Sequence, residues 1–307
     1  MPKTQFAGLL VPAVTPVDTA FDVDHKTFAA ICRWLLDQGA HGLVVFGTTS
    51  EANSLSVKAR REALDRLLES GVRGDLLLPG TGMSALADTV ELTRHAVSAG
   101  CGGVLMLPPF YYKPASDDGL FGFFAEAIER VGSSDLGVWL YHIPQNTGVP
   151  VTHTLIERLR ARYPDTVLGI KDSSGDWANT EVLLKQHPGL RVFPSSEGVL
   201  LKALRLGAAG CISATGNVNP AGIRALYDGW QGPDADRLQS AAAEIRTIVS
   251  SYTLVPAVKA VLAAQLNLPA LNAPLPPLTP LASEQRDELL SRLAAIGYHL
   301  TPLPTAA

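Results

Sequence analysis

The sequence predicts an α/β protein that folds as a (β/α)8 TIM barrel with a C-terminal helical extension. Three observations support this. Eight short apolar runs recur along the chain, stretches with helical periodicity separate them, and the first run lacks the glycine fingerprint of an open nucleotide-binding sheet.

The eight apolar runs have the character of buried parallel strands. They are GLLVPAV from Gly8, GLVVFG from Gly42, DLLLPG from Asp75, GVLMLPP from Gly103, GVWLYHIP from Gly137, VLGIKDS from Val167, RVFPSS from Arg191 and GCISATG from Gly210. Their apolar residues are consecutive rather than alternating, which is typical of strands covered on both faces. The strands of an antiparallel sandwich would instead alternate apolar and polar residues.

Helical segments connect these runs. LSVKARREALDRLLESG follows the second run and SALADTVELTRHAVSAG the third, and Gly71 and Gly100 stand where a helix-ending glycine belongs. Repeated strand–helix units are compatible with two main architectures, an open doubly wound sheet and a closed barrel. The count of eight favours the barrel, and VPAVTPVDTAF stands where a Rossmann sheet usually carries G-x-G-x-x-G.

The chain continues beyond the eighth run, from about Asn219, with more helical pattern than one barrel helix needs. We expect a barrel over 1–230 and a C-terminal helical extension over 231–307. The stretch NLPALNAPLPPLTPLAS predicts an extended strap, whose interleaved leucines favour burial over a proline-rich recognition segment.

Composition narrows the class of partner. The chain has 307 residues, 47% hydrophobic and 18% charged, with a net charge of −4 and a pI near 6.0. The slightly negative net charge gives no reason to expect nucleic acid or an anionic membrane as a partner. The sequence does not begin with a signal-peptide pattern. The three cysteines Cys32, Cys101 and Cys211 have no metal-binding or disulfide spacing, so we expect buried thiols, no metal and a cytoplasmic protein.

Strand ends carry the chemistry of a barrel, and two of them are informative. Lys171 follows Val-Leu-Gly-Ile, so its amine is expected at the barrel mouth, where burial lowers the pKa of a lysine and frees it to attack a carbonyl. A lysine that reaches solvent or pairs with Asp172 is the alternative. Tyr141 closes the neighbouring run and is placed to move protons, although a core aromatic also fits this position.

Two further segments are candidates. Thr48 and Thr49 follow the second run, where hydroxyls in a tight turn suit the carboxylate of a 2-oxo acid, or simply cap the next helix. Tyr111 lies in PPFYYKP after the fourth run, as a second phenol or as part of an aromatic loop between subunits.

These segments, in this order, resemble the family of N-acetylneuraminate lyases and dihydrodipicolinate synthases. The match runs through LLVPAVTPV, GTTSE, PPFYYK, YHIPQNTG, GIKDSSG and the strap LPPLTPL, nearly the whole chain. The resemblance implies Lys171 as Schiff-base lysine, Tyr141 as proton relay and Thr48 with Thr49 as carboxylate site. It also implies Tyr111 as a relay tyrosine from the neighbouring subunit. Ile212 falls where the family lends backbone contacts to a bound pyruvyl group. A homotetramer without metal or diffusible cofactor is implied as well.

Two departures bear on the substrate. Dihydrodipicolinate synthases carry an arginine where this chain has Asn146, and loss of such a charged contact costs roughly 1.5 to 3 kcal/mol. Ser50 replaces a common glycine and is expected to add a hydroxyl beside the carboxylate site. The motifs are closer to 4-hydroxy-2-oxoglutarate aldolases, so we expect cleavage of a 4-hydroxy-2-oxo acid into pyruvate and an aldehyde. Dihydrodipicolinate synthesis, sugar-acid dehydration and a non-catalytic 2-oxo acid binding homologue remain open.

Overall fold

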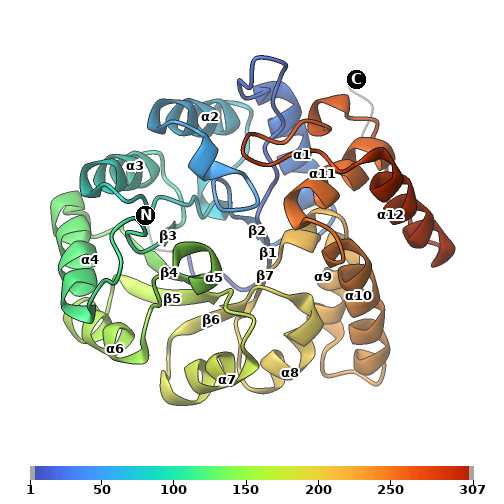
Figure 1. The fold of residues 1–307 in the computed structure, drawn as a ribbon. Coiled ribbons are helices and arrows are strands. Elements are labelled where there is room, and N and C mark those ends of the chain that lie inside the picture. The colour runs from blue at the N-terminus through green and yellow to red at the C-terminus, as the bar shows by residue number, and fades with distance from the viewer. Residues whose placement is uncertain (1–3, 304–307) are drawn as a thin grey trace.

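The computed structural model describes residues 4–303 and confirms the predicted fold. A ring of parallel strands lies at the centre, helices surround it, and further helices follow at the C-terminus (Figure 1). Consecutive apolar residues form these strands because the barrel interior covers one face and the helices cover the other.

Seven regular strands occur within residues 4–303. They are β1 Gly8–Val11, β2 Gly42–Leu43, β3 Val104–Met106, β4 Val138–His142, β5 Val167–Asp172, β6 Arg191–Pro194 and β7 Gly210–Ile212. They pair in parallel in the orders β2-β1-β7 and β3-β4-β5-β6.

The third apolar run differs from the prediction of a regular strand. Its start is a 3-10 turn, Gly74–Leu76, and the following segment makes only isolated parallel bridges, Leu43 with Leu77 and Gly80 with Leu105. Pro79 has no N–H to donate, which interrupts a regular ladder. The segment still bonds to both neighbours, since the N–H of Gly80 donates to Val45 and the carbonyl of Pro79 accepts from Leu105. It therefore fills the gap between β2 and β3 and completes the eight-stranded ring.

The other seam closes in the same way. The N–H of Ala209 donates to the carbonyl of Val192, 3.0 Å away, and the carbonyl of Ala209 accepts from Gly8. These bonds join β6 to the β1–β7 pair, so the strand ends meet around one mouth.

The helices follow the expected pattern. They are α1 His25–Asp37, α2 Val57–Glu69, α3 Leu86–Ser98, α4 Asp117–Val131, α5 Pro144–Thr147, α6 His153–Arg162, α7 Trp177–Gln186, α8 Leu200–Arg205, α9 Pro220–Gly229, α10 Ala235–Ser250, α11 Leu254–Gln265 and α12 Ser283–Ala295. Short 3-10 turns occur at Ala52–Ser54, Glu197–Val199, Ala214–Asn217 and Pro269–Leu271. Gly71 and Gly100 have the positive φ values, 93° and 75°, that end helices α2 and α3 as predicted.

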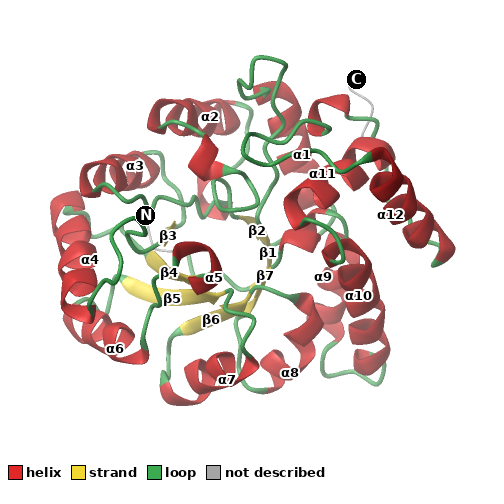
Figure 2. Cartoon of the chain, viewed as in Figure 1, coloured by secondary structure: helices red, strands yellow, loops and turns green. Residues whose placement is uncertain are grey.

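The C-terminal helices pack against one side of the barrel, while α5 lies over the strand ends (Figure 2). We propose the expected division after residue 230, which falls between α9 and α10. The proline-rich stretch has a 3-10 turn at Pro269–Leu271 and no other regular structure up to α12. Leu271 and Leu275 of this strap are buried, as the interleaved leucines predicted.

Two sets of apolar residues make the core. The larger set lies between strands and helices, and the smaller set fills the barrel interior, with Leu10, Val44, Leu105, Phe193 and Ile212 among its members. Both sets are almost completely buried. The interior is therefore packed, and only its mouth is open to a substrate.

Two cysteines are buried as expected, Cys32 and Cys211, whereas Cys101 is half-buried; all three are free thiols. Burial raises the pKa of the Cys101 thiol to about 12. Burial therefore favours the protonated thiol, which is the less reactive form of a cysteine.

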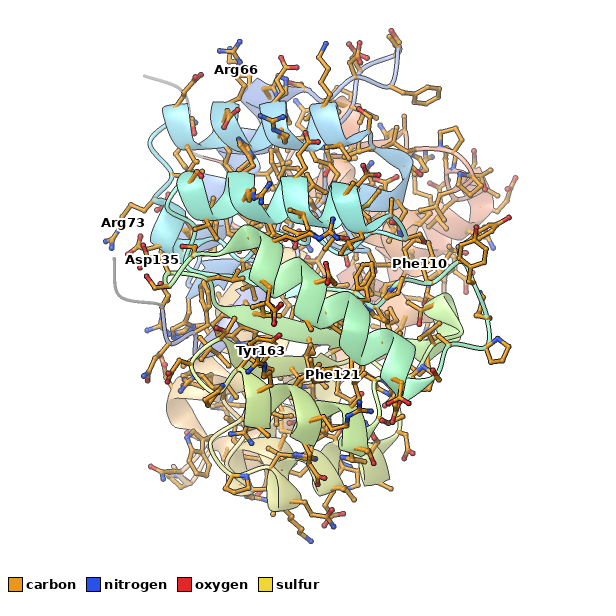
Figure 3. All side chains as sticks on the ribbon, turned by 90° about the vertical axis from the view of Figure 1, so that its left-hand side faces the viewer. Arg66, Arg73, Phe110, Phe121, Asp135 and Tyr163 are labelled. Carbon is orange, nitrogen blue, oxygen red and sulfur yellow. The ribbon has the colours of Figure 1, made fainter. Side chains whose placement is uncertain are left out.

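The two ends of the barrel are distinct. Viewed from the side, Phe110 lies at one end of the stacked outer helices, and Arg73 and Asp135 lie at the other (Figure 3). Phe110 follows β3, so its end is the one where the strands finish. Within residues 4–303 no single helix is long and apolar enough to cross a membrane. Helices α10 and α11 reach that length only together, with a bend of 107° between them.

Candidate active site

Packing inside the barrel determines where Lys171 points. Trp139 fills the interior beside Gly169, where an added Cβ would lie 2.3 Å from the Trp139 Nε1 atom. Because side chains alternate along a strand, the residue two positions after Gly169 also faces inward. Lys171 is that residue, and only 4% of it is exposed. A lysine that extends into solvent is thus excluded.

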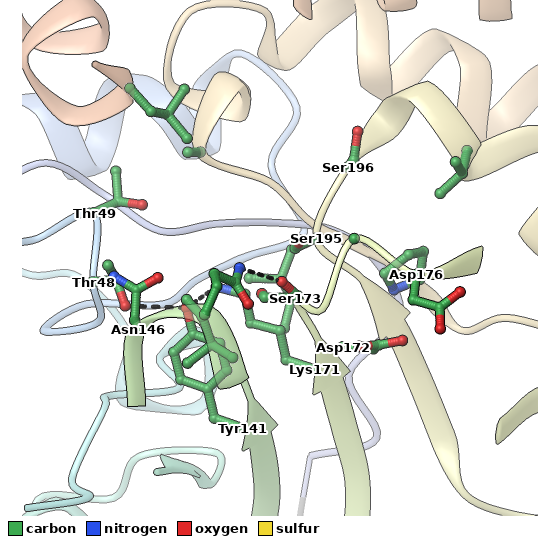
Figure 4. Close-up of a pocket in the computed structure, with 18 of the residues that line it drawn as sticks. Thr48, Thr49, Tyr141, Asn146, Lys171, Asp172, Ser173, Asp176, Ser195 and Ser196 are labelled. Atoms are coloured by element: carbon green, nitrogen blue, oxygen red, sulfur yellow. Dashed lines mark hydrogen bonds between the residues drawn. The ribbon is translucent and has the colours of Figure 1, made fainter. Parts of the chain in front are cut away.

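Lys171 on β5 and Tyr141 on β4 lie directly beside each other in the parallel strand pair. The Nζ atom of Lys171 lies 3.2 Å from the Tyr141 hydroxyl, which lies 3.1 Å from the Oγ1 atom of Thr48. Three strand ends therefore supply one chain of polar groups from an amine through a phenol to a hydroxyl (Figure 4).

Asp172 faces away from this chain and is bonded by other groups. Its two oxygens accept hydrogen bonds from the N–H of Ser174, the amide of Asn179 and the hydroxyl of Thr180. The carboxylate thereby holds the start of α7 in place. The alternative in which Lys171 pairs with Asp172 is not what the structure has.

The turn after β2 contributes two small hydroxyl residues to the pocket. Thr48 and Thr49 both line it, and Thr49 is 5% exposed. Ser50 differs from the expectation, because its hydroxyl donates to the carbonyl of Ala13 at 2.6 Å and the residue is completely buried. Ser50 therefore ties the turn to the segment after β1 instead of adding a group to the pocket.

The pocket at the strand ends has a volume of about 590 Å³. Of the predicted site residues it contains Lys171, Tyr141, Thr48, Thr49, Ile212 and Asn146. Ile212 is the last residue of β7, and Asn146 lies on α5 above the mouth. This volume is much larger than a three-carbon acid such as pyruvate would fill.

Tyr111 does not lie in this pocket. It is 73% exposed and stacks edge-on against Tyr112, which is 85% exposed. Within one chain it therefore cannot join Tyr141. Its proposed place in a neighbouring subunit's site stays a prediction.

Sequence reasoning missed several pocket residues. Ser195 and Ser196 follow β6 at a strand end, where the rule that located Lys171 would also have found them. Arg246 and Thr253 come from the C-terminal extension, and no sequence signal marks them because they reach the pocket only through the packing of α10 and α11.

The described residues offer an amine, a phenol and hydroxyls, and hold no group of three or more His, Cys, Asp or Glu side chains able to bind a metal ion. An amine buried beside a phenol is suited to attack a carbonyl carbon and to pass protons.

The chain is similar over nearly its whole length to known proteins of one family. The model of the dihydrodipicolinate synthetase family matches residues 5–296. A protein of Chloroflexus aurantiacus described as an uncharacterized DapA-like lyase is 36% identical over 303 residues, with 98% of this chain and 99% of that protein covered. A 4-hydroxy-tetrahydrodipicolinate synthase of Parasynechococcus marenigrum is 32% identical, with 95% and 96% covered.

Solved structures share the architecture. Dihydrodipicolinate synthase from Agrobacterium tumefaciens superposes with a TM-score of 0.87 at 30% identity, covering 94% of this chain and 99% of that one. A prophage protein of the dihydrodipicolinic acid synthase family from E. coli K12, in complex with pyruvate, gives a TM-score of 0.87 at 26% identity, with 96% and 100% covered. The chain is therefore an enzyme, a lyase that belongs to the dihydrodipicolinate synthetase family.

Proposed function

We propose that this protein is a class I aldolase that cleaves a 4-hydroxy-2-oxo acid reversibly into pyruvate and an aldehyde through a Schiff base on Lys171. The observation that carries the proposal is the chain from Lys171 Nζ through the Tyr141 hydroxyl to Thr48 Oγ1, with contacts of 3.2 and 3.1 Å, inside the pocket. These contacts have the length that proton transfer between positioned groups requires.

The reaction follows from these groups. The neutral amine of Lys171 adds to C2 of the substrate to give a carbinolamine. The Tyr141 hydroxyl donates its proton to the departing C2 oxygen, so water leaves, a protonated imine forms and Tyr141 becomes a phenolate. The phenolate then accepts the proton of the 4-hydroxyl as the C3–C4 bond breaks. The electron pair of that bond moves into the imine and leaves an enamine, while the aldehyde departs. A proton returned to C3 and addition of water then release pyruvate and the free lysine.

Thr48 and Thr49 hold the carboxylate of the 2-oxo acid in this proposal, and the main chain at Ile212 contacts the pyruvyl group. Their hydroxyls bind an anion without placing a second cation next to Lys171. The complex of the E. coli prophage protein with pyruvate supports a 2-oxo acid as the ligand.

A second candidate is synthesis of 4-hydroxy-tetrahydrodipicolinate from pyruvate and aspartate semialdehyde. It is favoured by the relatives that carry this name at 32% identity. Asn146 disfavours it, because the position on α5 that faces the pocket lacks a charged partner for the aldehyde's carboxylate. Condensation of pyruvate with that aldehyde, measured beside cleavage of 4-hydroxy-2-oxo acids, decides between the two.

Borohydride trapping with pyruvate, followed by peptide mass spectrometry, tests the Schiff base. We expect an adduct on Lys171 in the wild type and in Lys185→Ala, a control at an exposed position on α7, and none in Lys171→Ala. Absence of an adduct from the wild type would leave a non-catalytic binding homologue as the better explanation.

We further propose that the enzyme needs no metal or diffusible cofactor and acts as a cytoplasmic homotetramer. Activity after exhaustive treatment with a chelator tests the first point. Sedimentation analysis tests the assembly.

A further inference from the structure

One cation in the pocket has no place in the proposed chemistry. Arg246 lies on α10 of the C-terminal extension and lines the cavity, far along the chain from every predicted site residue. Of the lysine and arginine side chains in the described residues, it and Lys171 alone line this pocket. A guanidinium at a pocket wall is a ready partner for a carboxylate.

The structure fixes this guanidinium by one of its nitrogens. Nη1 donates to the hydroxyl of Ser213 at 3.0 Å, to that of Thr215 at 3.4 Å and to the carbonyl of Ser195 at 3.5 Å. The carboxylate of Glu197 lies 3.7 Å from Nη1. Since these contacts all start from Nη1, the rest of the planar group stays available to a ligand, and 20% of the side chain is exposed.

Glu197 does not compete for that ligand. It is completely buried, accepts hydrogen bonds from the hydroxyls of Ser213 and Thr215, and is not part of the pocket wall. Its charge orients Arg246 from behind. An anion in the pocket therefore meets the guanidinium and not the carboxylate.

The location of Arg246 assigns it to one end of the substrate. Figure 4 shows Thr48 and Thr49 on one side of Lys171 and Tyr141, and Ser195 with Ser196 on the other. Arg246 contacts the carbonyl of Ser195 and so belongs to the second side.

We propose that Arg246 binds a second anionic group of the substrate, at the end opposite the 2-oxo acid carboxylate, so that the enzyme prefers dicarboxylic 4-hydroxy-2-oxo acids. This inference rests on the proposed function. It places the charged contact on α10 and not at Asn146 on α5, so the second carboxylate would be held at a different position from the one at which dihydrodipicolinate synthases carry an arginine.

The test compares two acids of equal length, 2-oxoglutarate and 2-oxopentanoate, which differ by a carboxylate in place of a methyl group. The concentration for half-maximal borohydride trapping on Lys171 is measured for wild type, Arg246→Met and Arg237→Met. Arg237 lies on the same helix and pairs with Asp234 at the surface, so it controls for loss of charge on α10.

We expect Arg246→Met to raise the half-saturating concentration of 2-oxoglutarate about 10-fold or more, with no change for 2-oxopentanoate or for pyruvate. Arg237→Met should behave as wild type. An equal change for both acids, or none, would overturn the inference and assign Arg246 a purely structural role. If Arg246→Met does not fold, Arg246→Gln carries the same expectation.

Failure of the proposed function is visible separately. Should pyruvate give no adduct on wild type, the Schiff base is wrong, and calorimetric binding of the same two acids still decides the role of Arg246. Preference for the dicarboxylate that is lost in Arg246→Met supports the anion site, and equal binding of both acids overturns it.

Discussion

The Nζ atom of Lys171 lies 3.2 Å from the hydroxyl of Tyr141 and 4.3 Å from the centre of its ring. The phenol thus provides both a packing surface and a proton-transfer group for the amine. In Tyr141→Phe the ring remains and the proton carrier is lost. We expect turnover to fall about 10² to 10⁴-fold while borohydride still traps pyruvate on Lys171. Steady-state kinetics of aldol cleavage check this, and unchanged turnover would exclude Tyr141 as the relay.

Thr48 extends the same chain by one hydroxyl, 3.1 Å from Tyr141. Thr48→Val removes the hydroxyl at nearly constant volume, and Thr48→Ser keeps it. We expect turnover to fall in the valine variant and to be largely retained in the serine variant. If both variants lose activity equally, the shape of the turn matters and the hydroxyl does not.

Tyr111 and Tyr112 form a matched pair for testing a contribution from a neighbouring subunit. Both are exposed on the same loop, and only Tyr111 is expected to complete the relay. Tyr111→Phe should lower turnover, and Tyr112→Phe should not. A mixture of Tyr111→Phe and Lys171→Ala chains, dissociated and reassembled, should regain activity because one combined site carries both groups. No recovery in mixed oligomers would contradict a contribution in trans.

A buried ion pair joins the C-terminal extension to the turn that carries Thr48 and Thr49. Lys259 on α11 donates to Glu51 over 2.5 Å, and each side chain is 1% exposed. Lys259→Met leaves the carboxylate buried without its partner, so we expect a loss of about 3–5 kcal/mol in the free energy of unfolding. Denaturant titration measures it.

Two controls sharpen that measurement. Lys185→Met breaks the exposed pair with Glu181 and should have no comparable effect. The double variant Glu51→Gln with Lys259→Met removes the isolated charge and should be more stable than Lys259→Met alone. A double variant that is no more stable would show that lost packing, not the unpaired charge, explains the loss.

Two buried histidines, His142 and His187, and the half-buried His41 make stability depend on pH. Burial lowers the pKa of His41, His142 and His187 below the ordinary value of 6.5, and the neighbouring His153 lowers that of His187 further. The unfolded chain therefore binds more protons than the folded one as pH falls below 6.5. Their contribution to stability is complete above that pH and is lost as pH falls through the folded pKa values.

We expect the free energy of unfolding to fall as the pH drops below the ordinary histidine pKa of about 6.5. His187→Gln should reduce this slope, because it removes one of the groups whose pKa is lowered in the folded chain, the imidazole whose Nε2 lies 2.9 Å from His153 Nδ1. His299→Gln, at an exposed position, is the control. A slope that is the same in all three proteins would contradict the assignment to His187.

Local sequence pattern predicted much of the fold and part of the candidate site. Consecutive apolar residues predicted buried parallel strands, and the polar residues that end them pointed to Lys171, Tyr141, Thr48 and Thr49. This succeeds because strand alternation and the common mouth of a barrel fix where such residues lie. The third apolar run shows the limit, since Pro79 interrupts the regular strand pairing that the run alone predicts.

Tertiary structure alone decided the rest. Ser50 turns away from the pocket because the carbonyl of Ala13 lies within reach of its hydroxyl. Arg246 enters the pocket because α10 packs against the turn after β7, a contact between residues that no local periodicity relates. The sequence by itself determined the strands, the helices and the chemistry of the strand ends. Which distant side chains share the pocket was decided by long-range packing, because those contacts form only when the barrel closes.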